Sequence, residues 1–165
     1  MTRKDEAAGV PPRDVWPTPG PQSEGGAALT DVVLATFRLN ARLMEAAQGL
    51  AAHGGLTAAW WQVLGGVLRE PHSVADVGRI MGVSRQAVQR IADLLVARGL
   101  AEYRPNPAHR RAKLLACTEA GHYAIRQIAV AQHPWTSELA ETVDLDDLRT
   151  TLRTMQALIT KLEEA

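Results

Sequence analysis

Residues 73–100 read SVADVGRIMGVSRQAVQRIADLLVARGL and contain two helical patterns separated by a glycine. Ser73 lies three residues before Asp76, a spacing typical of a helix that begins with a serine cap. Gly82 permits the positive φ of a tight turn, and Ser84 supplies a cap for a second helix. The segment therefore predicts a helix, a short turn and another helix.

Both predicted helices are amphipathic. The first is expected to bury a row of four residues: Val74, Val77, Ile80 and Met81. The second is expected to run over residues 84–98 and to end at Gly99. Its apolar residues fall within an arc of roughly 120°, given a turn of 100° per residue. They are Ala87, Val88, Ile91, Leu94 and Leu95.

The opposite face of the second helix carries Arg85, Gln86 and Gln89 in its first turns. Arginine pairs with guanine and glutamine with adenine in a major groove, so these residues are expected to contact bases. Three further residues are expected to contact phosphates: Ser73, Ser84 and Arg90. The alternative is a helical hairpin whose Arg/Gln face is only solvated.

A β-hairpin is expected directly after the second helix, with strands over residues 100–104 and 112–117. The loop between them contains prolines and carries Arg110 and Arg111 near its tip. Adjacent arginines on a stiff loop can reach a narrow minor groove, where the negative potential favours arginine. The pattern predicts a winged helix-turn-helix in which this loop is the wing.

The distribution of charge also favours a nucleic-acid partner. The formal net charge of the chain is zero, but residues 79–113 contain eight basic and two acidic side chains. The segments on either side are net negative. A basic segment in an otherwise acidic chain is typical of a nucleic-acid footprint, whereas a solvated face more often mixes both signs.

The N-terminal part predicts a tail and two helices. Residues 1–27 are rich in proline and glycine and are expected to be disordered or loosely packed. A helix is expected from Thr30–Asp31 to Gly54–Gly55, apolar over most of its circumference. Such a helix is buried on more than one side, either inside the core or between the core and a partner chain. A second helix is expected over residues 57–70, ended by Pro71.

The C-terminal part predicts two more helices. The first begins at Thr118 and is interrupted near His133–Pro134, and the second is capped by Asp144. The last helix carries an apolar row at helical spacing, consisting of Leu148, Leu152, Met155, Ile159 and Leu162. Such a stripe suits packing against another long helix, which predicts a homodimer built from the N- and C-terminal helices.

From Leu56 to Gly121, about two-fifths of the chain, the sequence resembles the MarR (multiple-antibiotic-resistance regulator) family of transcription factors. The matching residues are Leu56-Thr57, Trp61, Val63-Leu64, Pro71 to Gln86, Leu95, Gly99-Leu100, Arg110-Arg111 and Thr118 to Gly121. The resemblance implies a homodimer with interlocking terminal helices, recognition helices in successive major grooves of a pseudo-palindromic operator, and wings beside them. One departure is His109, where many members carry an aspartate that positions the following arginine.

The expected fold is mainly α: a winged helix-turn-helix with a small β-hairpin wing and N- and C-terminal dimerisation helices. Residues 28–165 are expected to form one domain. Its DNA-binding lobe is residues 56–117, flanked by dimerisation helices in residues 28–55 and 118–165. The expected function is a cytoplasmic, homodimeric repressor that binds duplex DNA sequence-specifically. The alternative is a winged-helix dimer that serves as a protein-interaction or ligand-sensing module.

Members of this family often respond to small aromatic ligands, so release from DNA by such an effector is a further expectation. Four aromatic residues are candidates for its pocket: Phe37, Trp60, Trp61 and Tyr123. Cys117 precedes a predicted helix start, where a thiolate is favoured. A redox switch and a buried core cysteine are the two alternatives for this residue, and the second is favoured because no resolving cysteine exists.

Several other classes of protein are not expected. The sequence has no phosphate-binding loop, no cysteine pair and no metal-ligand spacing among its five histidines, so catalytic, cofactor and metal sites are not expected. Residues 46–68 carry no charge, but their five glycines favour two helices over a membrane span. The first six residues show no apolar run, so a signal peptide is not expected.

Overall fold

The structure of the chain, a computed structural model, describes residues 11–109 and 111–164. Within these residues it is mainly helical, with a three-stranded antiparallel sheet of order β1–β3–β2, which confirms the predicted fold class. In chain order the elements are η1 (Arg13–Val15), α1 (Glu24–Ala52), α2 (Ala58–Gly65), β1 (His72–Ser73), α3 (Val74–Met81), α4 (Arg85–Ala97), β2 (Ala101–Arg104), β3 (Leu114–Cys117), α5 (Glu119–Ala140) and α6 (Leu145–Glu163).

The chain divides after Ala41, within α1, into two compact units. In the first unit Ser23 caps α1, because its Oγ accepts the N–H of Gly26 at 3.1 Å. The helix therefore begins at Glu24, whereas the sequence predicted a start at Thr30–Asp31. That prediction is wrong because the glycine pair lies in the first turn, where the cap rather than the helix propensity decides the boundary.

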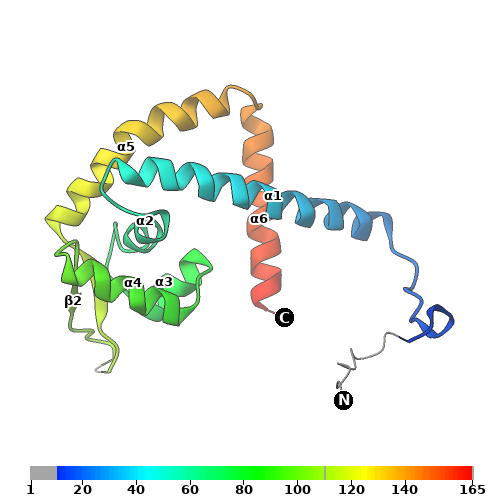
Figure 1. Ribbon diagram of the computed structural model, residues 1–165, viewed down its shortest axis with the longest axis horizontal. Coiled ribbons are helices and arrows are strands. Elements are labelled where there is room, and N and C mark those ends of the chain that lie inside the picture. The colour runs from blue at the N-terminus through cyan, green and yellow to red at the C-terminus, as the bar shows by residue number, and fades with distance from the viewer. Residues whose placement is uncertain (1–10, 110, 165) are drawn as a thin grey trace, which may run out of the picture. The chain divides into compact units, whose positions relative to one another are not determined.

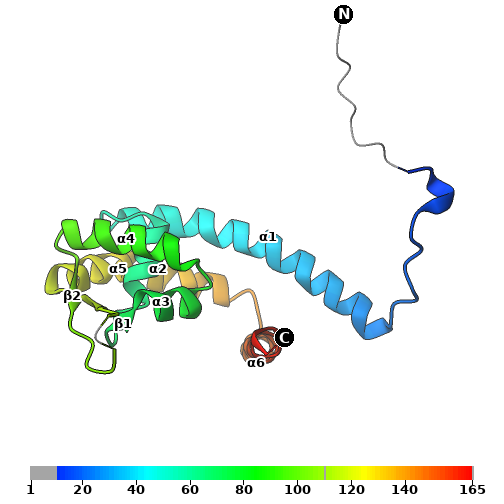
Figure 2. The same ribbon diagram turned by 90° about the horizontal axis from the view of Figure 1, so that it is seen from below.

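The second unit is organised around α2, α3 and α4, which lie next to one another, and α4 also lies next to the hairpin strand β2 (Figure 1, Figure 2). Apolar side chains from these elements and from α5 form its core. The largest fully buried ones are Leu64, Leu95, Leu115, Ile128, Val63, Val77 and Val88. Burying one such side chain contributes about 1.5–3 kcal/mol, so this core holds α4 and the hairpin in a fixed relation.

The helix-turn-helix forms through the caps that the sequence predicted. The Oγ atom of Ser73 accepts the N–H of Asp76 at 3.2 Å and begins α3. Gly82 has a φ of 63° in the turn, and Ser84 then accepts the N–H of Ala87 at 3.2 Å to begin α4. These predictions are confirmed, and each depended on hydrogen bonds between close neighbours in the sequence.

The buried faces of α3 and α4 differ from the prediction at two positions. Ile80 is 56% exposed and Leu94 is 46% exposed, so both were wrongly assigned to the core. In α3, Gly78 is buried in addition to the predicted Val74 and Val77, and an added Cβ on Gly78 would lie 2.7 Å from the carbonyl oxygen of Val83. In α4 the small Ala92 is buried instead, because this helix packs against both α2 and α3.

The helix α2 is shorter than predicted. Thr57 caps it, since its Oγ1 accepts the N–H of Trp60 at 3.2 Å. The helix ends at Gly65 instead of continuing to residue 70. Two adjacent glycines, Gly65 and Gly66, have low helix propensity and stop the helix before Pro71 is reached.

The helix α5 runs through Pro134 without a break, so the interruption predicted near His133–Pro134 is wrong. A proline leaves the carbonyl one turn earlier without its hydrogen bond. Two hydroxyls bond to carbonyls beside it: Ser137 donates to His133 at 2.9 Å, and Thr136 donates to Gln132 at 3.0 Å. Neither bond involves Val130, whose carbonyl is the one that Pro134 leaves without a backbone donor, and the helix nevertheless continues through the proline.

The strand β1 was not predicted. Its two residues pair with β3, with His72 opposite Leu115 and Ser73 opposite Leu114. A strand of two residues has no alternating pattern that a sequence can reveal. The pairing joins the start of α3 to the same sheet as the hairpin.

The terminal helices carry apolar side chains that the described chain leaves uncovered. Asp144 caps α6 as predicted, since its Oδ1 accepts the N–H of Asp146 at 2.7 Å. No residue of α6 is buried, and Ala51 is the one buried residue of α1. Despite these apolar faces, none of the helices in the described ranges has the length and hydropathy needed to cross a membrane.

Candidate nucleic-acid interface

The exposed face of α4 carries the residues that the sequence predicted to contact bases and phosphates. They are Arg85, Gln86, Gln89 and Arg90, directly after the cap Ser84. Nearby ion pairs use other side chains: Arg79 pairs with Asp76 at 2.8 Å, and Arg104 pairs with Glu102 at 2.7 Å. Within the part of the chain that the structure describes, Arg85 and Arg90 have no acidic partner, so their charge remains available to a ligand.

A hollow of about 320 Å³ lies between the start of α3, the first turns of α4 and the wing. Its lining residues are Ser73, Val74, Ala75, Arg85, Gln89, Tyr103, Arg111, Ala112 and Lys113. Four of the predicted site residues therefore meet here: Ser73, Arg85, Gln89 and Arg111. Three cationic side chains around one hollow attract an anion such as a phosphate. Ser84, Gln86 and Arg90 are not part of the lining.

Two residues of the hollow, Tyr103 and Lys113, were not predicted as site residues. Tyr103 projects from β2 and packs partly on the core. The Nζ of Lys113 lies 5.9 Å from the centre of the Tyr103 ring, a distance at which a cation is attracted to an aromatic face. The sequence predicted that Tyr103 and Lys113 lie in the basic segment and in the hairpin strands. It did not predict that the folded hairpin brings these two residues beside α4.

A hydrogen-bonded triangle joins the wing to α4. The Nε2 of Gln89 donates to Asp93 Oδ1 at 2.9 Å and to the Tyr103 hydroxyl at 2.8 Å. The Tyr103 hydroxyl in turn donates to Asp93 Oδ1 at 2.8 Å. Desolvation, followed by the hydrogen bond and charge of Asp93, raises the pKa of Tyr103 to about 12. The phenol therefore keeps its hydrogen throughout the neutral range.

Ser73 is already hydrogen bonded in two ways. Its Oγ accepts the backbone N–H of Asp76, and its hydroxyl donates to Asp76 Oδ2 at 2.6 Å. The hydrogen bond from Ser73 is the largest cause that lowers the pKa of Asp76 below 3.8, followed by the charge of Arg79 and opposed by desolvation. A phosphate contact through the Ser73 hydroxyl, as predicted, requires the bond to Asp76 Oδ2 to break.

The wing begins where β2 and β3 separate, after the pair Arg104 and Leu114. Asn106 shapes the loop, because its Oδ1 accepts the N–H of Ala108 at 2.9 Å. Arg111 is exposed in this loop. The other predicted wing residue, Arg110, lies outside the described residues.

Comparison with known proteins identifies this arrangement. The model of the MarR family matches residues 54–112, which run from the turn before α2 to the wing. The uncharacterized protein Rv2011c of Mycobacterium tuberculosis is 36% identical over 132 residues, which cover 80% of this chain and 92% of that protein. The chain belongs to the MarR family.

Two solved structures with the same fold and one further sequence relative illustrate the similarity. The regulator BldR from Sulfolobus solfataricus superposes with a TM-score of 0.71 at 16% identity, over 82% of this chain and 99% of that one. CouR from Rhodococcus jostii RHA1, bound to p-coumaroyl-CoA, superposes with a TM-score of 0.66 at 21% identity, over 78% and 92%. The transcriptional repressor MprA of Escherichia coli K12 is 31% identical over 101 residues, 58% of this chain and 57% of that protein. This chain therefore has the winged-helix fold of the MarR regulators.

The cysteine of this MarR-family chain lies in the core. Cys117 is 8% exposed at the end of β3, and burial raises the pKa of its thiol from 9.0 to about 11. A thiol of this kind is a poor nucleophile, because the reactive form is the thiolate. Burial therefore favours the core-residue alternative over the redox switch.

The rate of alkylation of Cys117 tests this interpretation. At pH 8 we expect iodoacetamide to modify the native protein at least about 100-fold more slowly than the unfolded chain, since a pKa two units higher leaves about 100-fold less thiolate. Mass spectrometry of timed samples measures both rates, with the urea-unfolded protein as the control. Modification of the native protein at the unfolded rate would contradict a buried, protonated thiol.

The structure places the four candidate effector-pocket residues in different surroundings. Trp60 is partly buried, and the guanidinium of Arg98 lies 4.6 Å from its ring centre. Trp61 is also partly buried against the core. Tyr123 is 64% exposed on α5, and Phe37 is 69% exposed in the first unit.

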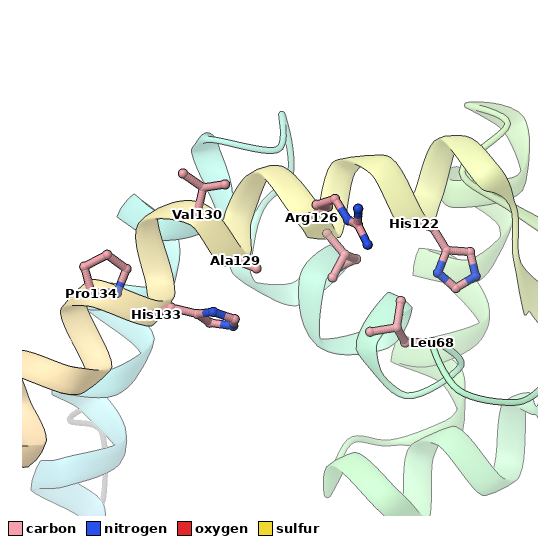
Figure 3. Close-up of a pocket in the computed structure, with 8 residues that line it drawn as sticks. Leu68, His122, Arg126, Ala129, Val130, His133 and Pro134 are labelled. Atoms are coloured by element: carbon pink, nitrogen blue, oxygen red, sulfur yellow. The ribbon is translucent and has the colours of Figure 1, made fainter.

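An apolar groove of about 670 Å³ runs along α5, and its lining does not include Trp60 or Trp61. His122, Arg126 and His133 all come from α5, with Arg126 one turn and His133 about three turns after His122, and they line the groove together with Leu68 (Figure 3). Tyr123 lines a second hollow beside it, with His122 and Arg126. Neither of these two surfaces includes Trp60, Trp61 or Phe37.

Proposed function

We propose that the chain is a homodimeric transcriptional repressor that binds duplex DNA sequence-specifically and has no catalytic role. The observation that carries this proposal is the cationic hollow, in which Arg85 and Gln89 of α4 meet Arg111 and Lys113 of the wing. A helix that presents Arg and Gln side chains suits the base edges of a major groove, and the neighbouring cations suit the phosphates that flank it. The proposed location is the cytoplasm.

The roles of the site residues follow from their positions on α4 and the wing. Arg85, Gln86 and Gln89 contact bases in the major groove. Ser84, Arg90 and Ser73 contact phosphates, since they lie at helix starts or at the edge of the reading face. Arg110 and Arg111 of the wing enter the adjacent minor groove.

The terminal helices provide the dimer interface in this proposal. The apolar row of α6 is exposed, with Leu152 at 57% and Ile159 at 55%, and a monomer would leave it in water. Residues 28–55 and 118–165 form this dimerisation part, and residues 56–117 form the DNA-binding lobe. Two-fold symmetry then places two recognition helices about one DNA turn apart, which requires a pseudo-palindromic operator.

The decisive experiment is fluorescence anisotropy with duplex DNA from the upstream region of the protein's own gene. A scrambled duplex of the same composition is the control, and both are titrated at several salt concentrations. We expect nanomolar binding to the native duplex, a clear preference over the scrambled one, and affinity that falls as salt rises. If no genomic duplex is preferred, even in a genome-wide selection, the protein-interaction module becomes the better explanation.

Substitutions on α4 separate base contacts from phosphate contacts. Replacing Arg85 or Gln89 by alanine is expected to weaken operator binding by about 1–3 kcal/mol and to relax specificity at one base position. Arg90→Ala is expected to weaken all sequences alike and to reduce the dependence of affinity on salt. Anisotropy with operators altered at single positions measures these effects. Uniform weakening by Gln89→Ala, combined with a base-specific effect of Arg90→Ala, would reverse the assigned roles.

A small aromatic effector that releases the repressor is the remaining part of the proposal. Two observations support it: the structural relative CouR was solved with p-coumaroyl-CoA, and this chain has an apolar groove beside α5. Of the four candidate pocket residues, Tyr123 lines the hollow beside this groove, whereas Phe37, Trp60 and Trp61 line neither surface and stay predictions from the sequence. Aromatic acids at saturating concentration that change neither the melting temperature nor the DNA affinity would count against an effector.

A further inference from the structure

The side chains of Gln89, Asp93 and Tyr103 form a closed set of hydrogen bonds on the reading face of α4. The three distances, between 2.8 and 2.9 Å, join the amide nitrogen, one carboxylate oxygen and the phenol oxygen to one another. Gln89 and Asp93 are one helical turn apart, and Tyr103 reaches them from β2. A residue expected to contact a base is therefore held by two residues that were not expected to contact DNA.

The chemistry of the partners fixes which end of the Gln89 amide faces them. An ionised carboxylate can only accept hydrogen bonds, and the one hydrogen of the Tyr103 hydroxyl is donated to Asp93. Both partners therefore present acceptors to Gln89, and only its NH2 group can satisfy them. The carbonyl oxygen Oε1 makes no hydrogen bond to the described residues, and it is the end of the amide left for a ligand.

The triangle is held in place by its surroundings. Tyr103 is partly buried and packs on the core, so its hydroxyl has little freedom to leave. Its ring contacts Lys113, and its strand pairs with β3, where Tyr103 is opposite Leu115. Its raised pKa of about 12 keeps the hydrogen that Asp93 accepts.

We propose that Asp93 and Tyr103 are positioning residues that orient Gln89 to present its carbonyl oxygen to the DNA. Gln89 then selects a base that carries an amino group in the major groove. Adenine presents N6–H2 there and cytosine N4–H2, whereas guanine and thymine present only acceptors at the corresponding edge. This inference rests on the proposed function and specifies the base class that one position of each half-site must have.

The oriented amide differs from a free glutamine in a measurable way. A free glutamine favours adenine, because it accepts from N6 and donates to N7 at the same time. With its NH2 group held by the protein, Gln89 loses the bond to N7, so adenine and cytosine become similar. Guanine and thymine are disfavoured, because their acceptors face the Gln89 oxygen.

The test compares wild-type protein, Asp93→Ala and Asp93→Asn in anisotropy titrations with four duplexes. These duplexes carry A, C, G or T at the one half-site position where Gln89→Ala removes the base preference. Asp93→Ala removes the acceptor, so the Tyr103 hydroxyl can donate to Gln89 Oε1 and the amide can turn over. Asp93→Asn removes the charge but keeps an acceptor oxygen, which makes it the matched control. Alanine and asparagine at an exposed helix position leave folding intact, and Tyr103→Phe provides a second variant that breaks the triangle.

The expected result is a ratio of affinities. Wild type is expected to bind the A and C duplexes about 5- to 10-fold more tightly than the G and T duplexes, the effect of about one hydrogen bond. Asp93→Ala is expected to reduce that ratio to about twofold or less, and Asp93→Asn to retain most of it. Removal of the negative charge raises the affinity for all four duplexes in both variants, so the ratio is unaffected by it.

The outcomes distinguish this inference from the proposed function. If wild type binds its operator specifically but Asp93→Ala keeps the same ratio, the positioning role is wrong and the repressor proposal stands. A loss of the ratio in Asp93→Asn equal to that in Asp93→Ala would also overturn it, since charge rather than hydrogen bonding would then be responsible. If wild type prefers no duplex at all, the proposed function fails, and the inference fails with it.

Discussion

Replacing Leu152 and Ile159 together by glutamate is expected to dissociate the homodimer and to lower operator affinity by at least about 100-fold. Both side chains are more than half exposed on α6, a helix with no buried residue. In the proposed dimer they are covered by the partner, and two carboxylates in that interface would be desolvated without partners. A monomer holds one half-site only and loses the gain in effective concentration that a second reading helix provides.

Light scattering and anisotropy measure the two effects separately. The chain has a mass of 17.8 kDa, and wild type is expected at twice that value, with the double variant at the single value. The control is Thr150→Glu with Ala157→Glu, which adds the same charge to the opposite side of α6. If Leu152→Glu/Ile159→Glu remains dimeric and binds the operator normally, α6 is not part of the interface.

Gly78→Ala is expected to destabilise the fold by roughly 2–3 kcal/mol. A Cβ on Gly78 would lie 2.7 Å from the carbonyl oxygen of Val83, which is closer than van der Waals contact permits. The obstacle is backbone rather than a flexible side chain, so α3 must move away from the turn. The Val83 N–H also donates to the Gly78 carbonyl at 2.9 Å, and this hydrogen bond would be strained by the same movement.

Gly65→Ala is the matched control for this substitution. Gly65 is the last residue of α2, and a Cβ there has no atom within 4 Å. Alanine has the higher helix propensity, by about 0.8–1.0 kcal/mol in a helix interior, so this variant is expected to be unchanged or slightly more stable. Chemical denaturation at one fixed protein concentration measures both values, because the stability of a dimer depends on concentration. Equal stability of the two variants would show that the turn tolerates a side chain at Gly78.

The features predicted correctly from the sequence are those decided by local hydrogen bonds. The cap at Ser73, the turn at Gly82 and the cap at Ser84 each depend on residues within a few positions. The exposed positions of Arg85 and Gln89 follow from the period of a helix whose apolar side must face the core.

The features that were not predicted depend on contacts between residues that are distant in the sequence, or on a helix that tolerates a residue which usually breaks helices. Ile80 and Leu94 are apolar but exposed, because their helices pack through the smaller Gly78 and Ala92. Pro134 lies inside α5 without ending it, although proline removes one backbone hydrogen bond from a helix. Helix periodicity cannot show either effect.

The candidate interface also combines residues that could be predicted locally with contacts that depend on the folded chain. Arg85, Gln89 and Arg111 were predicted from residue type, and the structure places all three around one hollow. The contact of Tyr103 with Gln89 spans 14 residues and depends on how the hairpin folds back on α4. The sequence reveals a strand and a helix at these positions, but not which of their side chains meet.

The pairing of β1 with β3 has a mechanical consequence for a regulator of this kind. Because β1 leads directly into α3 and β3 also pairs with β2, the start of the motif and the wing share one sheet. The Gln89–Tyr103 hydrogen bond adds a link from that sheet to α4. In the proposed dimer, each DNA-reading head is therefore expected to be stiff. A signal that arrives through the long helices would then have to change the distance between the two heads along the DNA, while each head keeps its own structure.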